Sequence, residues 1–345
     1  MDRNTLRALP KAELHRHLDG SIRLQTVADI AARQKIDLES TDIEELKRKA
    51  VISAPMKDLQ SVLNSFATMQ KVLCSYEAIE RIAFENVEDA YRDGIQLIEL
   101  RFAPPFISAG KRLDNDEIIE AVLDGITRGM EHYPIEVGLI GILVRGADVE
   151  VNRRATEDLI RYSSATHRNG DRICGFDLAD AEDRCDPEEL LPMVRQAREA
   201  GLGITIHSGE NTSAEAVRRT LDLFHPQRIG HGIRAWGNEP LLERIRQQEI
   251  MLEVCPTSNW LTRSVASLEE HPLPLLHKAG VPVSINSDDP NLFGIDLVHE
   301  YELCSRLYGF TEHDFMGINS QTVKHSFLPA SIRAKVLKSR FAEAG

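Results

Sequence analysis

The stretch ICGFDLADAEDRCDPEELLPMVRQAREAGLGITIHSGE, residues 173–210, contains the pattern that decides the fold. It opens and closes with short apolar or β-branched runs, and the segment between them carries apolar side chains at helical spacing before the stop signal Gly201. The residues on one face of this predicted helix are Leu190, Leu191, Val194 and Ala197. A strand, a helix and a second strand in this order predict two parallel strands joined by a helical crossover.

The same alternation of apolar runs and amphipathic segments recurs along the whole chain. The predicted strands are AELHRH near 12, IQLIELRFA near 95, IEVGLIGILV near 135, ICGFDLA near 173, GITIHSG near 203, RIGHG near 228, IMLEVCPTS near 250 and VPVSINSDD near 281. No Gly/Ser-rich or Pro-rich linker and no internal repeat divides them, which favours one domain over residues 1–345. We therefore expect an α/β fold, a single (β/α)8 TIM-type barrel with a helical insertion after the first strand. An open doubly wound sheet is the alternative, but no G-x-G-x-x-G motif follows the first strand.

Composition argues against several classes of protein. Of the 345 residues, 42% are hydrophobic and 28% are charged, which is typical of a globular protein rather than a disordered chain. The net charge of -13 disfavours nucleic acid as the main partner, because phosphate binding needs clustered Lys and Arg. The chain has no long apolar run, no apolar signal segment near its start, and no C-x-x-C pair among its 5 cysteines. These features predict a cytoplasmic protein that acts on a small molecule away from membranes, and they leave the oligomeric state open.

Polar residues stand at the ends of the predicted strands, where barrel enzymes carry their active sites. They are His15 and His17 on the first strand, Asp177 and Asp180 on the fourth, His207 on the fifth, His231 on the sixth, and Asp288 and Asp289 on the eighth. Imidazoles and a carboxylate that meet at the barrel axis are ligands that suit zinc. We predict one Zn2+ per chain with an open position for water, and its ligands are His15, His17, His207 and Asp288. A second metal is not expected, because the fourth strand has no lysine that could bridge two ions.

The alternative for any one of these histidines is a packed or surface position, but the common register at strand ends argues against it for the set. The other histidines fall on predicted helices or loops and are assigned no role: His132, His167, His225, His271, His277, His299, His313 and His325.

Three further residues could move protons or meet the substrate. Zinc lowers the pKa of a bound water from about 15.7 to about 7, so hydrolysis then needs a group that manages protons. Glu210 lies in HSGE, where Gly209 lets the chain turn, and could act as an acid; a helix-start carboxylate is the alternative. His231, between two glycines in RIGHG, could orient the hydroxide, or it could be a satisfied strand-end histidine. Asp289 could contact the substrate, because Pro290 ends the hydrogen-bond ladder of the strand directly after it. The alternative is that Asp289 lies in a surface turn.

Five motifs in combination resemble the adenosine deaminase family, from about residue 9 to about residue 325. PKAELHRHLDGS is similar to the family's first-strand signature, HSGE to its usual HAGE, EVCPTSN to its seventh-strand motif and SINSDDP to its usual SLNTDDP, while RIGHG matches as it stands. The cysteine-ligated base deaminases use H-x-E and P-C-x-x-C motifs, which this chain lacks. The resemblance implies a zinc-dependent hydrolase that deaminates a purine nucleoside.

The resemblance also implies a role for each matched residue. Asp288 would bind zinc and take a proton from the water, Glu210 would protonate purine N1, and His231 would hold the hydroxide that adds to C6. The substrate contacts would come from His17, Asp19, Asp180 and Asp289. Asp19 would bind the ribose 5′-hydroxyl, with a turn residue as its alternative, and Asp289 would meet N7. That last contact joins two acceptors, so it requires a proton on Asp289.

One residue departs from the family's pattern. The adenosine enzymes usually read DLAGDE after the fourth strand, whereas this chain reads DLADAE and places Asp180 at the glycine whose amide contacts purine N3. The N–H remains available, but the carboxylate would repel an acceptor nitrogen unless it turns aside, is protonated or meets a donor on a different substrate. We expect deamination of adenosine and 2′-deoxyadenosine to inosine and 2′-deoxyinosine. The alternatives are adenine or a 5′-substituted adenosine such as aminodeoxyfutalosine, and a catalytically silent barrel that binds a nucleoside.

The connection between the first two predicted strands is long enough to carry a lid. Within it, apolar side chains repeat at helical spacing, which by itself is more typical of a core stripe. They are Leu59, Val62, Leu63, Phe66 and Met69. Since similar family members place an apolar helix over the pocket, we expect residues 56–74 to cover the site.

Overall fold

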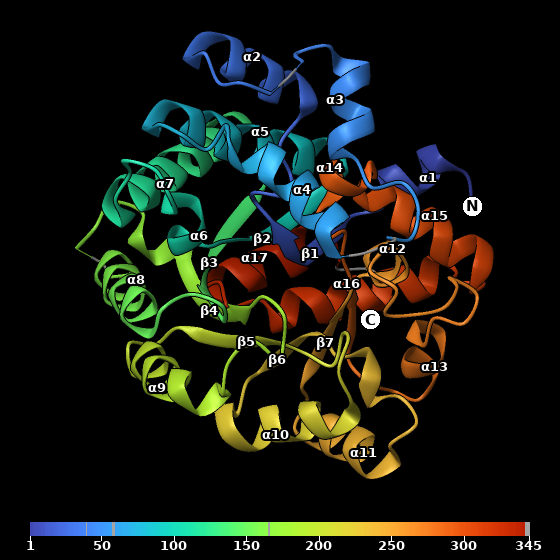
Figure 1. Cartoon of the computed structure of the whole chain (residues 1–345). Helices are drawn as coiled ribbons and strands as arrows, with labels where there is room; N and C mark the ends of the chain where they lie inside the picture. Colours follow the sequence, from blue (N-terminus) through green and yellow to red (C-terminus); the bar gives the residue numbers. More distant parts are fainter. Residues whose placement is uncertain (39, 57–58, 165, 342–345) are drawn as a thin grey trace.

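The centre of the molecule is a ring of parallel strands in the order β1 to β8 (Figure 1). The computed structural model describes residues 1–38, 40–56, 59–164 and 166–341, leaving aside the side chains of residues 59–64. The strands are β1 (Lys11–His17), β2 (Ile95–Phe102), β3 (Glu136–Val144), β4 (Ile173–Ala179), β5 (Gly203–Ser208), β6 (Arg228–His231), β7 (Met251–Val254) and β8 (Val283–Ile285). The ring closes just beyond β8, where Asp288 N donates to His15 O at 3.1 Å and His17 N donates to Asp288 O at 2.8 Å. The predicted (β/α)8 barrel is confirmed.

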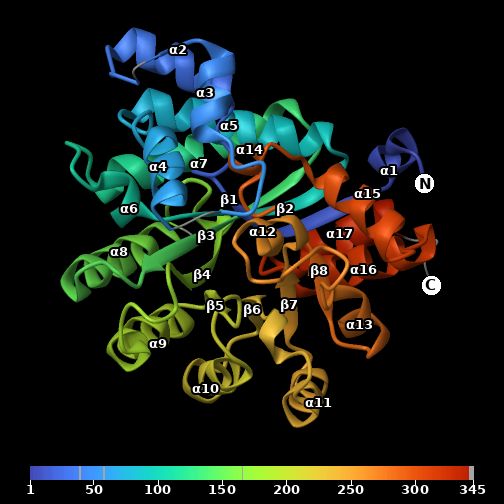
Figure 2. The same ribbon diagram turned by 45° about the vertical axis from the view of Figure 1, so that its right-hand side comes forward.

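Helices alternate with the strands and surround the ring (Figure 2). The helices outside the β1–β2 connection are α1 (Arg3–Ala8), α6 (Pro104–Ser108), α7 (Asn115–His132), α8 (Val149–Tyr162), α9 (Leu191–Glu199), α10 (Ala214–Phe224), α11 (Glu239–Gln247), α12 (Pro256–Leu261), α13 (Leu273–Lys278), α14 (Pro290–Phe293), α15 (Leu297–Leu307), α16 (Glu312–His325) and α17 (Ala330–Arg340). Short 3-10 turns are η1 (Gly170–Arg172), η2 (Pro187–Leu190) and η3 (Ile233–Ala235). Among the described residues, no helix combines the length and the apolar character needed to cross a membrane.

The strands are covered on both faces, which explains why their sequences are nearly continuous apolar runs. Every residue of β4 and β5 is buried. The covering helices begin at strong caps: Asp114 and Glu117 form a capping box at the start of α7, and Thr311 and Asp314 form another at α16. The helix caps in the sequence and the burial of the strands therefore both support the alternation of strands and helices.

Two predicted strands extend several residues beyond the strands in the structure. The run IMLEVCPTS was expected to be extended throughout, but β7 ends at Val254 and Pro256 begins α12. Proline is favoured in the first turn of a helix and cannot donate to a strand ladder, so it ends the strand here. The run VPVSINSDD contributes only Val283–Ile285 to β8.

The link between α16 and α17 closes the N-terminal end of the barrel. Phe327 packs there so tightly that a Cβ added to Gly175 or Gly203 would lie 2.7 Å or 2.2 Å from its ring. The Arg228 guanidinium lies 3.6 Å from the centroid of the same ring and pairs with Glu99 at 2.7 Å. The barrel is therefore filled at its base, and the polar strand ends lie at the opposite end.

The β1–β2 connection forms the predicted helical insertion. It contains α2 (Leu24–Gln34), α3 (Ile43–Ala50), α4 (Leu59–Gln70) and α5 (Tyr76–Arg92). In Figure 1 α4 lies in front of the barrel, across the end where the strands terminate. Two backbone hydrogen bonds tie the segment before it to that end: Ile52 N donates to Leu292 O at 2.8 Å, and Met56 N donates to Leu261 O at 3.0 Å.

Apolar contacts hold the second half of α4. Phe66 packs with Leu261 and Leu292 beside the strand ends, and Met69 is fully buried in the main core. The predicted stripe also includes Leu59, Val62 and Leu63, whose side chains lie outside the described residues. The position of α4 suits a cover over the site, and its movement stays a prediction.

Candidate active site

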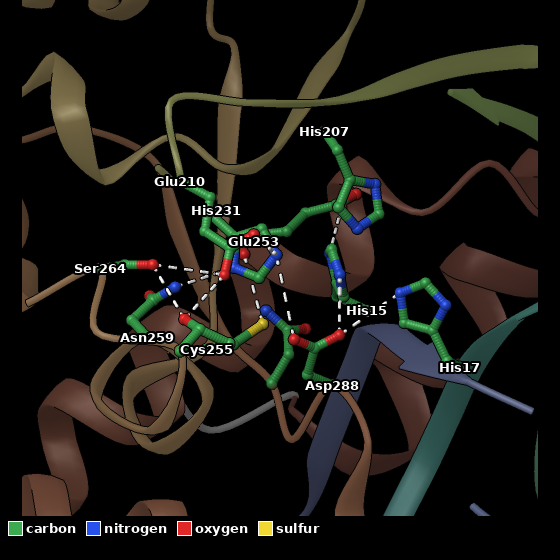
Figure 3. A network of polar contacts seen from close by, with 12 residues as sticks. His15, His17, His207, Glu210, His231, Glu253, Cys255, Asn259, Ser264 and Asp288 are labelled. Atoms are coloured by element: carbon green, nitrogen blue, oxygen red, sulfur yellow. Dashed lines mark hydrogen bonds and ion pairs between the residues drawn. The ribbon is translucent and has the colours of Figure 1, made fainter. Parts of the chain in front are cut away.

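Three histidines and an aspartate from strands far apart in the sequence meet at the C-terminal end of the barrel (Figure 3). One ring nitrogen from each of His15, His17 and His207 lies within 4.8 Å of the other two. Asp288 Oδ1 lies 3.2 Å from His15 Nε2 and 3.3 Å from His17 Nε2. The four predicted ligands are therefore brought together by the ends of β1 and β5 and by the residues that follow β8.

Buried carboxylates hold two of these rings from behind. His15 Nδ1 lies 2.9 Å from Glu253 Oε2, and His207 Nδ1 lies 2.9 Å from Asp177 Oδ2. The guanidinium of Arg101 bridges the two carboxylates, at 2.8 Å from each. Burial alone would raise the pKa of Glu253, but Arg101 and Arg228 hold it well below its usual value. Ionised carboxylates accept from Nδ1–H, so the Nε2 atoms of both rings are left with free lone pairs.

This arrangement fits a zinc ion. His15 Nε2 is buried without a hydrogen-bond partner among the described residues, and it faces the other nitrogens and the Asp288 carboxylate. A lone pair held in this way is costly unless something binds it, and three imidazoles with a carboxylate form a zinc donor set. The residues that would hold the metal are His15, His17, His207 and Asp288.

A thiol lies beside the same group. Cys255 Sγ is within 4.8 Å of ligand atoms of His15, His231 and Asp288. Burial raises the pKa of Cys255 well above its usual value, and the thiol donates to Glu253 O at 3.6 Å. A protonated thiol is a poor metal ligand, so the histidine set is favoured.

Glu210, in the turn after β5, and His231, at the end of β6, lie beside this cluster. Glu210 Oε2 lies 3.7 Å from His231 Nε2, while its other oxygen accepts from Thr262 Oγ1 at 3.0 Å. His231 Nε2 lies 3.9 Å from Asp288 Oδ2. One carboxylate oxygen of Glu210 is thus held in place, and the other faces His231.

The backbone at these positions is unusual. His231 and Asp288 both adopt left-handed conformations, with φ of 60° and 62°. Such angles are costly for residues with a Cβ and are concentrated at functional sites, where the surrounding structure enforces them. Gly230 is required for a steric reason, because an added Cβ would lie 3.1 Å from the His15 ring. The RIGHG motif therefore places His231 while leaving room for a neighbouring ring.

Asp289 is buried beside Gly20. Its Oδ1 has no hydrogen-bond partner among the described residues, and a Cβ on Gly20 would lie only 1.7 Å from that atom. Burial raises the pKa of Asp289 well above its usual value, and the negative charges of Asp288 and Asp19 raise it further. The carboxyl group is therefore suited to carry a proton and to donate it.

Asp19 connects the site to the helical insertion. Gln70, the last residue of α4, donates from Nε2 to Asp19 Oδ2 at 2.6 Å. Burial raises the pKa of Asp19 to about 6. Lys111, the cation near this carboxylate, donates to the carbonyl oxygens of Gln70 and Ile107 at 2.8 Å and 2.9 Å. The helical insertion thus supplies a direct hydrogen bond to Asp19, a predicted substrate-binding residue.

Asp180 turns its carboxylate toward backbone amides. Oδ2 accepts from Gly146 N at 3.1 Å and Oδ1 accepts from Ala181 N at 2.7 Å. The residue is exposed and has a φ of 79°, a conformation that normally favours glycine. Its carboxylate has therefore turned aside, which is one of the arrangements that would keep it from repelling an acceptor on the substrate.

Glu182 fixes the loop that carries Glu210. Its carboxylate accepts from Gly209 N at 2.8 Å, Glu210 N at 3.0 Å and Thr212 Oγ1 at 2.6 Å. Burial would raise the pKa of Glu182, but these hydrogen bonds outweigh it and lower the pKa below its usual value. Asn211 N also donates to it, at 3.4 Å, so the Glu182 carboxylate holds the chain at the turn after β5.

We expect Glu182→Gln to reduce kcat by about 10- to 100-fold, the range typical of residues that hold functional groups in place. The amide nitrogen of glutamine cannot accept a hydrogen bond, so at least one donor of the loop loses its partner. Steady-state kinetics with circular dichroism would measure the effect. Glu188→Gln is the matched control, since Glu188 is exposed on the same connection and pairs with Arg219 on the surface. Equal activity of both variants would remove Glu182 from this role.

Several polar residues that shape the site were not predicted as site residues from the sequence. Glu253 lies inside the quoted EVCPTSN motif, and Asn259 ends it, so the motif itself was the available signal. Glu182 likewise ends the quoted DLADAE run. Arg101 and Gln70 carry no such signal, because their partners are distant in the sequence.

Comparisons with known proteins agree with this geometry. The sequence model of the family described as adenosine deaminase matches residues 10–342. The adenosine deaminase of Salmonella typhimurium is 34% identical over 336 residues, which are 97% of this chain and 98% of that protein. The solved adenine deaminase from Arthrobacter aurescens has a TM-score of 0.87 and 27% identity, covering 97% of this chain and 99% of its own. Arabidopsis ADAL complexed with GMP has a TM-score of 0.85 and 25% identity, covering 99% of each chain. The chain therefore belongs to the adenosine deaminase family and is a hydrolytic deaminase.

Proposed function

We propose that this protein deaminates adenosine and 2′-deoxyadenosine with water, giving inosine or 2′-deoxyinosine and ammonia, and that it uses one zinc ion. The observation that carries the proposal is the meeting of a zinc donor set with Glu210, His231 and Asp288 at one end of the barrel. Binding alone would need neither an acid nor a group that orients an attacking oxygen. When bound, zinc would lower the pKa of a water at this site, so that hydroxide, the stronger nucleophile, would be available at neutral pH.

The side chains divide the proton chemistry between them. Glu210, held through Oε1 by Thr262, would donate a proton to purine N1 and so make C6 electrophilic. Asp288 would accept a proton from the attacking water, and His231 would orient its oxygen toward C6. Addition gives a tetrahedral carbon, and protonation of the exocyclic amine lets ammonia leave. The sum is one water consumed and one ammonia released.

Asp289 and Asp180 would bind the purine ring. A protonated Asp289 can donate to N7, which an ionised carboxylate cannot do. The N–H of Asp180 would meet N3, while its carboxylate stays with Gly146 and Ala181. These contacts would recognise the purine ring, and they would not distinguish between substituents on the sugar.

Asp19 favours a nucleoside over a nucleotide. With a pKa of about 6 it is largely ionised at neutral pH, so it can accept from a 5′-hydroxyl and would repel a 5′-phosphate. His17, two residues earlier at the end of β1, would support the same side of the ligand. Gln70 already donates to Asp19, which fixes the acceptor before substrate arrives.

A substrate screen tests the proposal. Ammonia release should be fast with adenosine and 2′-deoxyadenosine and slow with adenine, AMP and 5′-substituted adenosines. Asp19→Ala should reduce kcat/KM for adenosine by about 10- to 100-fold, since it removes a hydrogen bond to a charged acceptor, and should change activity on adenine little. Rapid turnover of another 6-aminopurine without activity on adenosine would overturn the choice of substrate.

A further inference from the structure

A chain of hydrogen bonds reaches His231 from the side opposite the predicted ligands. Leu273 N lies 3.0 Å from His271 Nδ1, His271 Nε2 lies 3.2 Å from Asn259 Oδ1, and Asn259 Nδ2 lies 3.1 Å from His231 Nδ1. Asn259, His271 and His231 are almost completely buried. Asn259 and His231 are among the residues drawn in Figure 3.

The direction of every hydrogen bond follows from the first one. The backbone N–H of Leu273 can only donate, so His271 Nδ1 must accept and carries no proton. His271 is neutral, since burial lowers its pKa to about 3, and its single proton therefore sits on Nε2. Nε2–H donates to the carbonyl oxygen of Asn259, and this fixes which end of the amide faces His231.

We infer that Asn259 and His271 are positioning residues that keep His231 in the neutral form with its proton on Nε2. The amide NH2 of Asn259 donates to His231 Nδ1, so Nδ1 presents a lone pair and the proton must lie on the other nitrogen. A carboxylate in the place of Asn259 would favour the opposite tautomer.

The inference rests on the proposed function for its catalytic consequence. His231 Nε2–H points into the space between Glu210 Oε2, at 3.7 Å, and Asp288 Oδ2, at 3.9 Å. A donor fixed there can stabilise negative charge on the attacking oxygen, but it has no lone pair with which to remove a proton. The proton from water must then go to Asp288, so the relay decides which of two neighbouring groups is the base.

The tautomer can be measured directly and without substrate. In the metal-containing protein labelled with 15N-histidine, long-range NMR correlations distinguish a protonated ring nitrogen from an unprotonated one, and His231→Ala identifies the signals. The expected result is a protonated Nε2 and an unprotonated Nδ1 on His231. A proton on Nδ1, or on both nitrogens at neutral pH, would overturn the inference, whichever purine proves to be the substrate.

Two variants test the relay itself. Asn259→Asp should move the proton of His231 to Nδ1 and lower kcat by about 100-fold, the usual loss for one donor to a developing charge, with KM changed less than about threefold. His271→Leu removes the donor that orients the amide, so the Asn259 amide should turn and the same change of tautomer should appear. If the tautomer remains unchanged in the folded Asn259→Asp variant, the relay does not set it.

Ser258→Ala is the matched control. Ser258 precedes Asn259 on α12 and is equally buried, and its hydroxyl has no hydrogen-bond partner in the described part of the chain. This variant should keep the wild-type NMR pattern and turnover. A loss of turnover as large as that of Asn259→Asp would mean that the helix is merely sensitive to substitution, and would contradict the inference.

Discussion

Glu210→Gln is expected to lose nearly all turnover while the protein keeps its metal. Glutamine has almost the same shape and can still accept from Thr262 and Ser264, which lie 3.0 Å and 3.4 Å from Glu210 Oε1. It cannot donate a carboxylic proton to the purine, so kcat should fall by about 100- to 10,000-fold, the usual contribution of a general acid.

Measuring zinc content beside kcat separates this role from a structural one. Glu210 is not among the predicted ligands, so the metal should stay at one ion per chain. Glu215→Gln is a suitable control, because Glu215 is exposed on α10 and pairs only with the surface residue Arg218 among the described residues. Activity above about one tenth of wild type would remove Glu210 from the mechanism, since the expected loss is far larger.

His17→Ala is expected to lose both metal and activity. His17 offers one of three nitrogens that lie within 4.8 Å of one another, and its removal takes one donor from the predicted set of four and leaves a gap among the others. Zinc affinity should fall by on the order of 100-fold or more, because even residues that only support a ligand cost 10- to 100-fold.

An exposed histidine provides the comparison. His313→Ala, on the surface of α16, should retain zinc and turnover. Metal analysis after gel filtration, together with an ammonia assay, would measure both variants. Full zinc content in His17→Ala would show that this side chain is not a ligand.

The fold could be predicted from local patterns because a barrel strand covered on both faces has to be apolar along its length. The polar residues that interrupt those runs then stand out, and parallel strands bring their C-terminal ends to one place. His15 and His207 could be identified in this way although they are 192 positions apart (207 - 15 = 192). The strand limits were less predictable, since Pro256 turns the end of an extended-looking run into a helix.

The roles of the supporting residues could not be predicted, because each depends on a partner that only the folded chain provides. Glu253 inside β7 has no evident purpose until Arg101 and His15 are seen beside it. His271 was assigned no role, since a histidine in a loop gives no sign that it contacts Asn259 twelve positions earlier. The direction of the Asp180 carboxylate likewise depends on Gly146, which follows a different strand.

Removal and return of the metal test the central claim most directly. The purified protein would be treated with a chelator, assayed for ammonia release from adenosine, and assayed again after zinc is added in measured amounts. We expect activity to fall in proportion to the metal removed and to return fully at one zinc per chain. A metal-free preparation that releases ammonia at the untreated rate would contradict the account.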